Sequence, residues 1–197
     1  RFSRDDTYVD ETYQIMPKEG YTRLFERMLS HSLISVLLEK DFFDLRDHLR
    51  PKVALVYTGP IDAYFDYCFG KLGWRSLAFE WIKVDREYAQ PCAVINYPSD
   101  NDYTRSVEIK HATGQKNPCS VISLEYPRAE GEPFYPVPTQ ENHKIYALYQ
   151  DLACRETAEK NVFFCGRLAT YSYLNMDQAI ENALELFKTL RERYTRV

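Results

Sequence analysis

Residues 75–113 form a series of short extended segments rich in aromatic and β-branched side chains, and this pattern predicts a fold that contains a sheet. The stretch VEIKHAT, residues 107–113, alternates apolar and polar side chains, as a strand with one buried face does. Residues 120–126 add a further segment of the same kind. We therefore predict that the middle of the chain pairs as an antiparallel sheet.

Segments of a different kind flank this region. Residues 53–57 and 161–165 are short apolar runs, which predict buried strands, and residues 142–154 predict a helix. The clearest element is a helix at residues 176–194, for which Asn175 is the predicted N-cap. Its apolar stripe comprises Ile180, Ala183, Leu184, Phe187 and Leu190.

The first fifty residues predict four shorter elements. These are a strand at 1–14, an amphipathic helix at 19–29, a strand at 33–38 and a helical turn at 44–49. The fold class that follows is α+β, with about six antiparallel strands beside strand-and-helix pieces of a second sheet.

We divide the chain between two domains on these patterns. The antiparallel-sheet domain comprises residues 1–52 and 74–150, and the strand-and-helix domain comprises residues 53–73 and 151–197. Because the second domain holds too few strands for a sheet of its own, we predict that it is incomplete. The chain also begins at RFSRDD without an initiating Met, so we interpret it as part of a longer protein.

The composition excludes several classes of function. With 25 basic and 29 acidic residues the net charge is -4, and no basic block favours nucleic acid or an anionic membrane. Five cysteines without a CxxC pair indicate neither a disulfide framework nor a zinc site. The sequence has no apolar run of membrane-spanning length and no leader. We therefore predict a soluble cytoplasmic protein without a metal.

Tyrosine is unusually frequent, with 16 among 197 residues. A tyrosine combines an apolar ring with a hydroxyl, which suits clefts that stack on rings and donate hydrogen bonds to sugars or phosphates. Half or more of these tyrosines equally fit ordinary strand and core positions, because aromatic residues favour strands.

Five collinear motifs carry a resemblance to a known family. They are Val56–Glu80 (VYTGPIDAYFDYCFGKLGWRSLAFE), Ala93–Asn96 (AVIN), Tyr103–Arg105 (YTR), Glu132–Val137 (EPFYPV) and Gly166–Ile180 (GRLATYSYLNMDQAI). From Tyr8 to the C-terminus the chain resembles the bacterial UDP-galactopyranose mutases, which take part in galactofuranose and polysaccharide biosynthesis.

The resemblance implies a fold and a division of labour. The family combines a Rossmann-like FAD-binding domain, a helical bundle and an antiparallel sheet. This chain would supply the sheet and the C-terminal strand and helix of the flavin domain. The GxGxxG fingerprint and the helical bundle are absent from it, so we expect the chain alone to retain little FAD and to be inactive.

The resemblance also implies substrate-binding residues. Arg105 would contact the substrate diphosphate and is the predicted catalytic residue, since a guanidinium stays charged and matches phosphate oxygens. The hydroxyls of Tyr8, Tyr135 and Tyr173 would surround the same diphosphate, and Asn96 would lie near the galactose hydroxyls. Without the resemblance, each of these residues fits an exposed strand face or a core.

Four residues are implied to contact reduced FAD. Gly166 would let the backbone approach the flavin, and Arg167 would place a cation beside it. Asn175 and Met176 open the last helix, whose N-terminus carries roughly half a positive charge and would favour an anionic flavin. The chain departs from the family at Asn175, where Asp is usual, and at Cys165, where Gly is common. His111 has no assigned role.

The reaction implied is an isomerisation without net redox change. Reduced flavin N5 attacks the anomeric carbon of UDP-galactopyranose and expels UDP, and UDP returns once the sugar ring has reclosed with five members. An alternative of another class is a noncatalytic UDP-sugar binding or interaction module. A flavin amine oxidase relative is disfavoured, because it would not need the tyrosines. Apolar surface left uncovered favours self-association, for example as a homodimer.

Overall fold

A computed structural model describes residues 12–99 and 101–194. The chain forms two compact units, each of which is described by itself. Unit 1 comprises residues 1–41 and 79–125, and unit 2 comprises residues 42–78 and 126–197. Two of the three boundaries, after residues 78 and 125, fall inside long strands, so the backbone there passes from one unit to the other within regular structure. The domain boundaries inferred from the sequence stay a prediction.

The antiparallel sheet has five strands in the order β3-β4-β5-β2-β6. They are β2 (Trp74–Val84), β3 (Val94–Asn96), β4 (Arg105–Val107), β5 (Ser120–Arg128) and β6 (Tyr135–Pro136). In unit 1, β4 pairs antiparallel with both β3 and β5. In unit 2, the start of β2 pairs antiparallel with β6.

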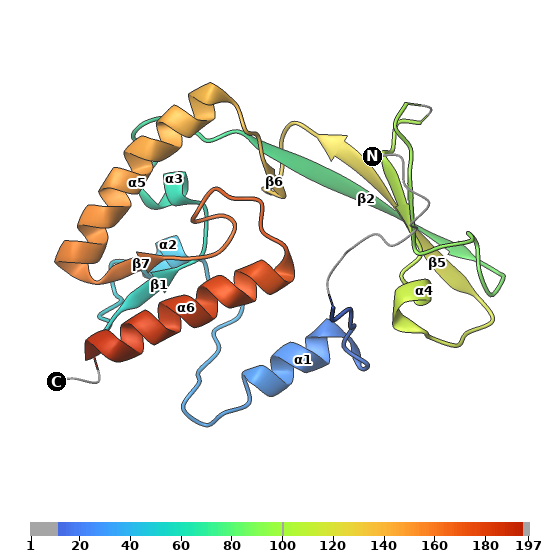
Figure 1. Cartoon of the computed structure of the whole chain (residues 1–197), viewed down its shortest axis with the longest axis horizontal. Helices are drawn as coiled ribbons and strands as arrows, with labels where there is room; N and C mark the ends of the chain where they lie inside the picture. Colours follow the sequence, from blue (N-terminus) through green and yellow to red (C-terminus); the bar gives the residue numbers. More distant parts are fainter. Residues whose placement is uncertain (1–11, 100, 195–197) are drawn as a thin grey trace. The chain divides into compact units, whose positions relative to one another are not determined.

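A second, parallel pair lies in unit 2, between β1 (Leu55–Tyr57) and β7 (Val162–Phe164). Helix α5 (Gln140–Lys160) contacts β7, and Figure 1 shows both helices α5 and α6 (Met176–Tyr194) beside this pair. Two short helices complete the unit, α2 (Phe42–Leu45) and α3 (Ile61–Tyr64). Together the two sheets confirm the predicted α+β class.

The apolar core belongs to unit 2. It is centred on Ile61, Leu72, Tyr149, Ala153 and Tyr171. All fully buried apolar residues in the described part of the chain lie in this unit. In unit 1, which also contains α1 (Gly20–Met28) and α4 (Lys110–Thr113), the fully buried described residues are polar: Ser106, Glu108, Lys110, Ser120 and Ser123.

Several local predictions are confirmed. Helix α6 has the predicted bounds, α1 falls within residues 19–29, and α5 contains residues 142–154. Asn175 precedes α6, and its N–H donates to the Gln178 side chain at 2.9 Å, which is half of a capping box.

Other local predictions are wrong. Residues 33–38 form no strand, because no neighbouring strand pairs with them and their leucines are exposed. Residues 12–14 are not in a strand either, while residues 1–11 lie outside the described part. The alternation in residues 107–113 ends early, since β4 stops at Val107 and α4 follows. By contrast, the helical turn predicted at 44–49 is present, since turn residues 46–48 follow α2 and the Leu49 N–H donates to the Leu45 carbonyl at 3.0 Å.

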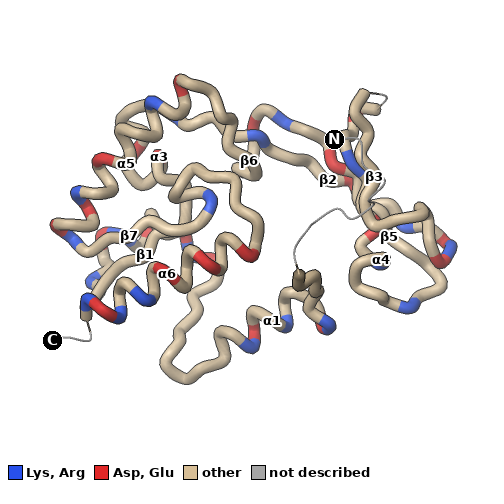
Figure 2. Tube along the Cα trace, in the orientation of Figure 1, with Lys and Arg blue, Asp and Glu red and all other residues tan. Residues whose placement is uncertain are grey.

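Most of the predicted apolar stripe of α6 does not face the core. Ile180, Leu184 and Phe187 are 57%, 56% and 58% exposed, and Leu190 is the one half-buried member of the stripe, whereas Leu186, outside the stripe, is half-buried as well. Charges of both signs are interspersed along α5 and α6 (Figure 2). Among the described helices, none is long and apolar enough to cross a membrane.

Candidate functional site

Tyr135 and Tyr173 form a stacked pair in unit 2. Their ring centroids are 5.6 Å apart and the ring planes differ by 15°. Tyr135 lies in β6, and Tyr173 is 60% exposed on the loop between β7 and α6. Two of the three tyrosines predicted to contact the diphosphate are therefore neighbours.

The guanidinium of Arg167 lies against both rings of this pair. Its Cζ is 5.4 Å from the centroid of Tyr135 and 4.8 Å from that of Tyr173. Its Nη1 donates to the Phe134 carbonyl at 2.8 Å, and its Nε donates to the Leu174 carbonyl at 3.1 Å. Nη2 also donates to Leu174. Each of the three guanidinium nitrogens of Arg167 thus donates at least one hydrogen bond to a backbone carbonyl.

The loop of residues 165–175, the 165–175 loop, is held in an unusual backbone conformation. Gly166 has φ +88° and Tyr171 has φ +45°, and the second value is costly for a bulky side chain. The Tyr171 hydroxyl donates to the Gly73 carbonyl at 2.6 Å and accepts from the Val137 N–H at 3.2 Å. These bonds fix the loop that presents Tyr173.

Cys165, at the start of this loop, continues the parallel pair. Its N–H donates to the Tyr57 carbonyl at 3.1 Å, and the residue is buried. Burial raises the pKa of the thiol, against a smaller opposing effect of the Gly166 backbone. The thiol therefore behaves as a small core group.

Arg105 and Asn96 lie together in unit 1. The register places Asn96 opposite Arg105 and Arg105 opposite Glu125 on three adjacent strands. Arg105 Nε donates to Asn96 Oδ1 at 3.1 Å, and Nη1 is 3.5 Å from Glu125 Oε2. The arginine side chain keeps 36% of its surface exposed. Two predicted substrate residues therefore support each other on one sheet face.

The remaining predicted site residues are distributed as follows. Tyr8 lies outside the described residues. Met176, in the first turn of α6, is 62% exposed. The Arg105 cluster belongs to unit 1 and the Tyr135–Tyr173 pair to unit 2.

Sequence reasoning missed a buried polar cluster in unit 1, centred on Glu108. Its carboxylate accepts from Ala89 N–H at 3.0 Å, from Gln90 N–H at 2.9 Å and from the Ser120 hydroxyl. Burial opposes the charged form, but these hydrogen bonds and nearby His111 outweigh it and lower the pKa of Glu108. The cluster holds residues 85–93 in place, a segment that we call the 85–93 loop. The signal available was the Glu–His spacing of one helical turn in EIKH.

His111 and Lys110 complete this cluster. His111 lies in α4 rather than on the predicted strand, with Nε2 2.9 Å from the Gln90 carbonyl and 3.3 Å from Glu108. Lys110 is 4% exposed, and its ammonium donates to the Glu87 carbonyl at 2.6 Å and to the Asn117 carbonyl. Both side chains are structural ties of the 85–93 loop.

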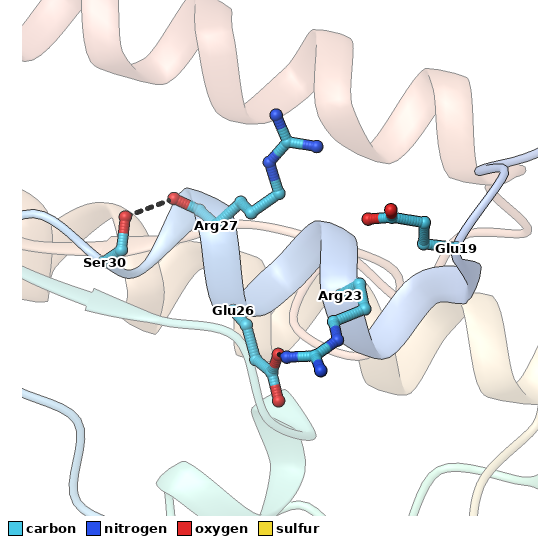
Figure 3. A pocket seen from close by; sticks show the side chains of 5 residues that line it. All are labelled: Glu19, Arg23, Glu26, Arg27 and Ser30. Atoms are coloured by element: carbon cyan, nitrogen blue, oxygen red, sulfur yellow. Dashed lines mark hydrogen bonds and ion pairs between the residues drawn. The ribbon is translucent and has the colours of Figure 1, made fainter.

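A surface hollow lies along α1 in unit 1 (Figure 3). It is lined by Glu19, Arg23, Glu26, Arg27 and Ser30. Arg23 and Glu26 form an exposed ion pair at 2.6 Å, so charges within the hollow already neutralise each other. No predicted site residue lies in it. Across the described residues, no group of His, Cys, Asp and Glu is arranged to hold a metal, and all five cysteines are free.

Comparisons with known proteins match the motifs. The family model for UDP-galactopyranose mutase covers residues 1–173. The chain is 40% identical over 190 residues to a probable UDP-galactopyranose mutase of Klebsiella pneumoniae. This match covers 94% of the chain and 48% of the relative. A UDP-galactopyranose mutase of Mycoplasma genitalium is 37% identical over 193 residues, covering 88% of the chain and 46% of the relative.

A further relative carries a different substrate in its name. It is the dTDP-fucopyranose mutase of Escherichia coli, 36% identical over 196 residues, covering 94% of the chain and 51% of the relative. The chain spans about half the length of the curated relatives it matches. Because the family model covers most of the chain and agrees with the motifs, the chain belongs to the UDP-galactopyranose mutase family.

Proposed function

We propose that the protein containing this chain interconverts UDP-galactopyranose and UDP-galactofuranose, and that this chain contributes part of its substrate-contacting surface. The observation that carries the proposal is the family match over residues 1–173, which includes Arg105, Tyr135 and Tyr173. The activity is proposed for the whole protein, since the chain corresponds to about half of its relatives.

Arg105 is proposed to bind the diphosphate of the nucleotide sugar. Its charge is permanent, and hydrogen bonds to charged groups contribute about 1.5–3 kcal/mol each. Asn96 and Glu125 hold the guanidinium from both neighbouring strands, so its orientation is set before substrate arrives. The Glu125 carboxylate also partly neutralises the positive charge of Arg105, which favours reversible binding of the diphosphate during turnover.

Tyr135 and Tyr173 are proposed to donate hydrogen bonds to the same diphosphate. A phenol is a neutral donor, so it orients a leaving group without retaining it as strongly as a cation does. This suits a reaction in which UDP departs and then returns. Support comes from the stacked geometry, which brings both rings to one place in unit 2.

The residues near the 165–175 loop fit a role in holding reduced FAD. A Cβ built at Gly166 meets no atom within 4 Å, so the backbone there is open to close approach. The 19-residue helix α6 begins at Met176, and its N-terminus favours negative charge. When bound, reduced FAD would supply the nucleophile for the anomeric carbon. The chain's share is to orient the sugar nucleotide and to stabilise the departing diphosphate.

The test is an isomerisation assay on the whole protein that carries this chain. With chemically reduced FAD, UDP-galactofuranose should be converted to UDP-galactopyranose, as followed by chromatography. Arg105→Lys and Arg105→Ala should lose most of this turnover while retaining flavin absorbance, and Arg86→Lys, a change of an exposed arginine in unit 1, should not. Near-normal turnover of both Arg105 variants would remove Arg105 from the site.

Two further measurements distinguish the competing functions. A parallel assay with dTDP-fucopyranose, the substrate in the name of the Escherichia coli relative, tests the nucleotide and sugar preference. Calorimetric titration with UDP tests the noncatalytic binding module, which predicts UDP binding without isomerisation. If neither the UDP-sugar nor the dTDP-sugar is isomerised, the mutase proposal is refuted.

A further inference from the structure

We propose that Arg167 is a positioning residue, whose guanidinium holds Tyr135 and Tyr173 as the stacked pair that receives the diphosphate. This inference rests on the proposed function. It differs from the expectation that Arg167 places a free cation beside the cofactor.

The ring contacts are the first support. The guanidinium carbon lies within 6 Å of both ring centroids, at 5.4 Å from Tyr135 and 4.8 Å from Tyr173, where a cation is attracted to the ring face. The two rings are nearly parallel and 5.6 Å apart. One cation therefore favours the same position for two side chains from distant parts of the chain.

The hydrogen bonds are the second support, and they are independent of the rings. Arg167 donates to the carbonyl of Phe134, the residue before Tyr135, and to the carbonyl of Leu174, the residue after Tyr173. Phe134 in turn donates its N–H to the Arg75 carbonyl of β2 at 3.0 Å. The guanidinium thus bridges the two backbone segments that carry the rings and links them to the sheet.

The chemistry requires an arginine for this task. Its three nitrogens donate along fixed directions in one plane, and here Nε and Nη2 point to one carbonyl while Nη1 points to another. A lysine has the charge and three donors, but all of them sit on one nitrogen, so it cannot reproduce the three bonds that the arginine makes from three separate nitrogens. Because all three nitrogens already donate to the protein backbone, we infer that the guanidinium acts mainly by holding the tyrosines in place.

The experiment uses the whole protein labelled with fluorotyrosine, in which the signals of Tyr135 and Tyr173 are assigned by Tyr→Phe changes. Arg167→Ala and Arg167→Lys should shift both signals toward those of exposed tyrosine, and thermal melting should show that the variants stay folded. UDP affinity should fall about tenfold, a loss of 1.4 kcal/mol. Arg155→Ala, which changes an exposed arginine of α5, should alter neither readout.

A double-mutant cycle separates positioning from direct contact. In a protein with both Tyr135→Phe and Tyr173→Phe, removal of Arg167 should weaken UDP binding no further, because there are no hydroxyls left to position. If Arg167 contacted UDP directly, its removal from the double-Phe protein would still weaken UDP binding.

Three results would overturn the inference. They are unchanged tyrosine signals in Arg167→Ala, full UDP affinity in Arg167→Lys, and a further loss of affinity in the double-Phe background. If the signals and the cycle behave as expected but no isomerisation occurs, the proposed function fails while the positioning role stands.

Discussion

The exchange of Glu108 for Gln perturbs the buried cluster that holds the 85–93 loop in unit 1. Both carboxylate oxygens accept hydrogen bonds, one from Ser120 and the other from Gln90, while Ala89 N–H is shared between them at 3.0 and 3.1 Å. Glu108→Gln preserves the shape of the side chain. It removes the charge and replaces one oxygen by an NH2 group.

The magnitude follows from how the amide can orient. The Ser120 hydroxyl can rotate to accept from the new NH2 group, so the amide oxygen takes the position that faces Ala89 and Gln90. Each of these N–H groups then exchanges a charged acceptor for a neutral one. Since charged hydrogen bonds contribute about 1.5–3 kcal/mol and neutral ones about 0.5–1.5 kcal/mol, two exchanges cost about 2 kcal/mol. The loss should appear as easier opening of the 85–93 loop.

Amide hydrogen exchange of Ala89 and Gln90 measures this opening directly. A loss of about 2 kcal/mol corresponds to exchange about 30-fold faster. The matched control is Glu87→Gln, the same chemical change on an exposed side chain of the same loop, and it should leave both amides unchanged. Exchange rates within about twofold of wild type in Glu108→Gln, a change below 0.5 kcal/mol, would refute the assignment of Glu108 as the tie of this loop.

The pH dependence gives a second check with a definite sign. The pKa of Glu108 in the folded chain lies below its ordinary value of 4.5. The unfolded chain therefore takes up this proton first as the solution is acidified, so the stabilisation is complete above pH 4.5 and is lost as pH falls below it. Glu108→Gln should lack this acid-dependent increase in exchange of the Ala89 and Gln90 amides.

Two further predictions concern unit 2. Burial is the largest of the effects that raise the pKa of Tyr64 from 10.0 to about 12, and the charge of Glu156 and the 3.3 Å hydrogen bond from Tyr64 to Glu156 add to it. The stability that the protonated Tyr64 contributes should therefore be lost as pH rises from 10 towards 12. Tyr64→Phe should lose less stability over that range in urea unfolding, and equal losses would contradict the assignment. On α6, Ile180→Ser should change the free energy of unfolding by less than about 0.5 kcal/mol, whereas Leu186→Ser should cost about 1–2 kcal/mol. Chemical denaturation of the two variants checks this, and a larger cost at the 57% exposed Ile180 would show that its stripe is covered.

Elements whose pattern is local could be predicted from the sequence. Helix α6 has the predicted bounds because its period and its N-cap residue are set by neighbouring positions. The face that packs could not be predicted in the same way. The stripe through Ile180 and Leu184 is the more apolar one, yet only Leu190 of that stripe is half-buried, and Leu186 outside it is half-buried too, because the surroundings of a helix decide which face is covered.

Strand predictions were weaker because a strand depends on a partner that local sequence does not specify. Residues 33–38 have the composition of a strand, but no strand pairs with them. Residues 108–113 alternate as a strand does, but Glu108 and His111 meet across one helical turn at 3.3 Å. A long-range network of side-chain hydrogen bonds thus overrode the local alternation.

The sequence predicted which residues belong to the candidate site, but it could not predict how they are arranged in space. Tyr135 and Tyr173 came from the family motifs, and their stacking joins segments 38 positions apart, which no local pattern reports. Arg167 also came from a motif, but its contacts with Phe134 and Leu174 depend on the folded path of the 165–175 loop. The roles of these residues toward substrate and cofactor stay predictions.

The two units differ in what fixes their side chains, and this bears on the site. In unit 2 the buried core is largely apolar, and apolar contacts tolerate repacking when volumes are kept. In unit 1 the fully buried described residues are polar, and hydrogen bonds act only along defined directions. Arg105 is held by directed bonds, between Asn96 and Glu125, and Arg167 is held in the same way in unit 2. The directed bonds therefore set where the proposed substrate-contacting groups stand, while the apolar core contributes to the stability of unit 2, which carries Tyr135 and Tyr173.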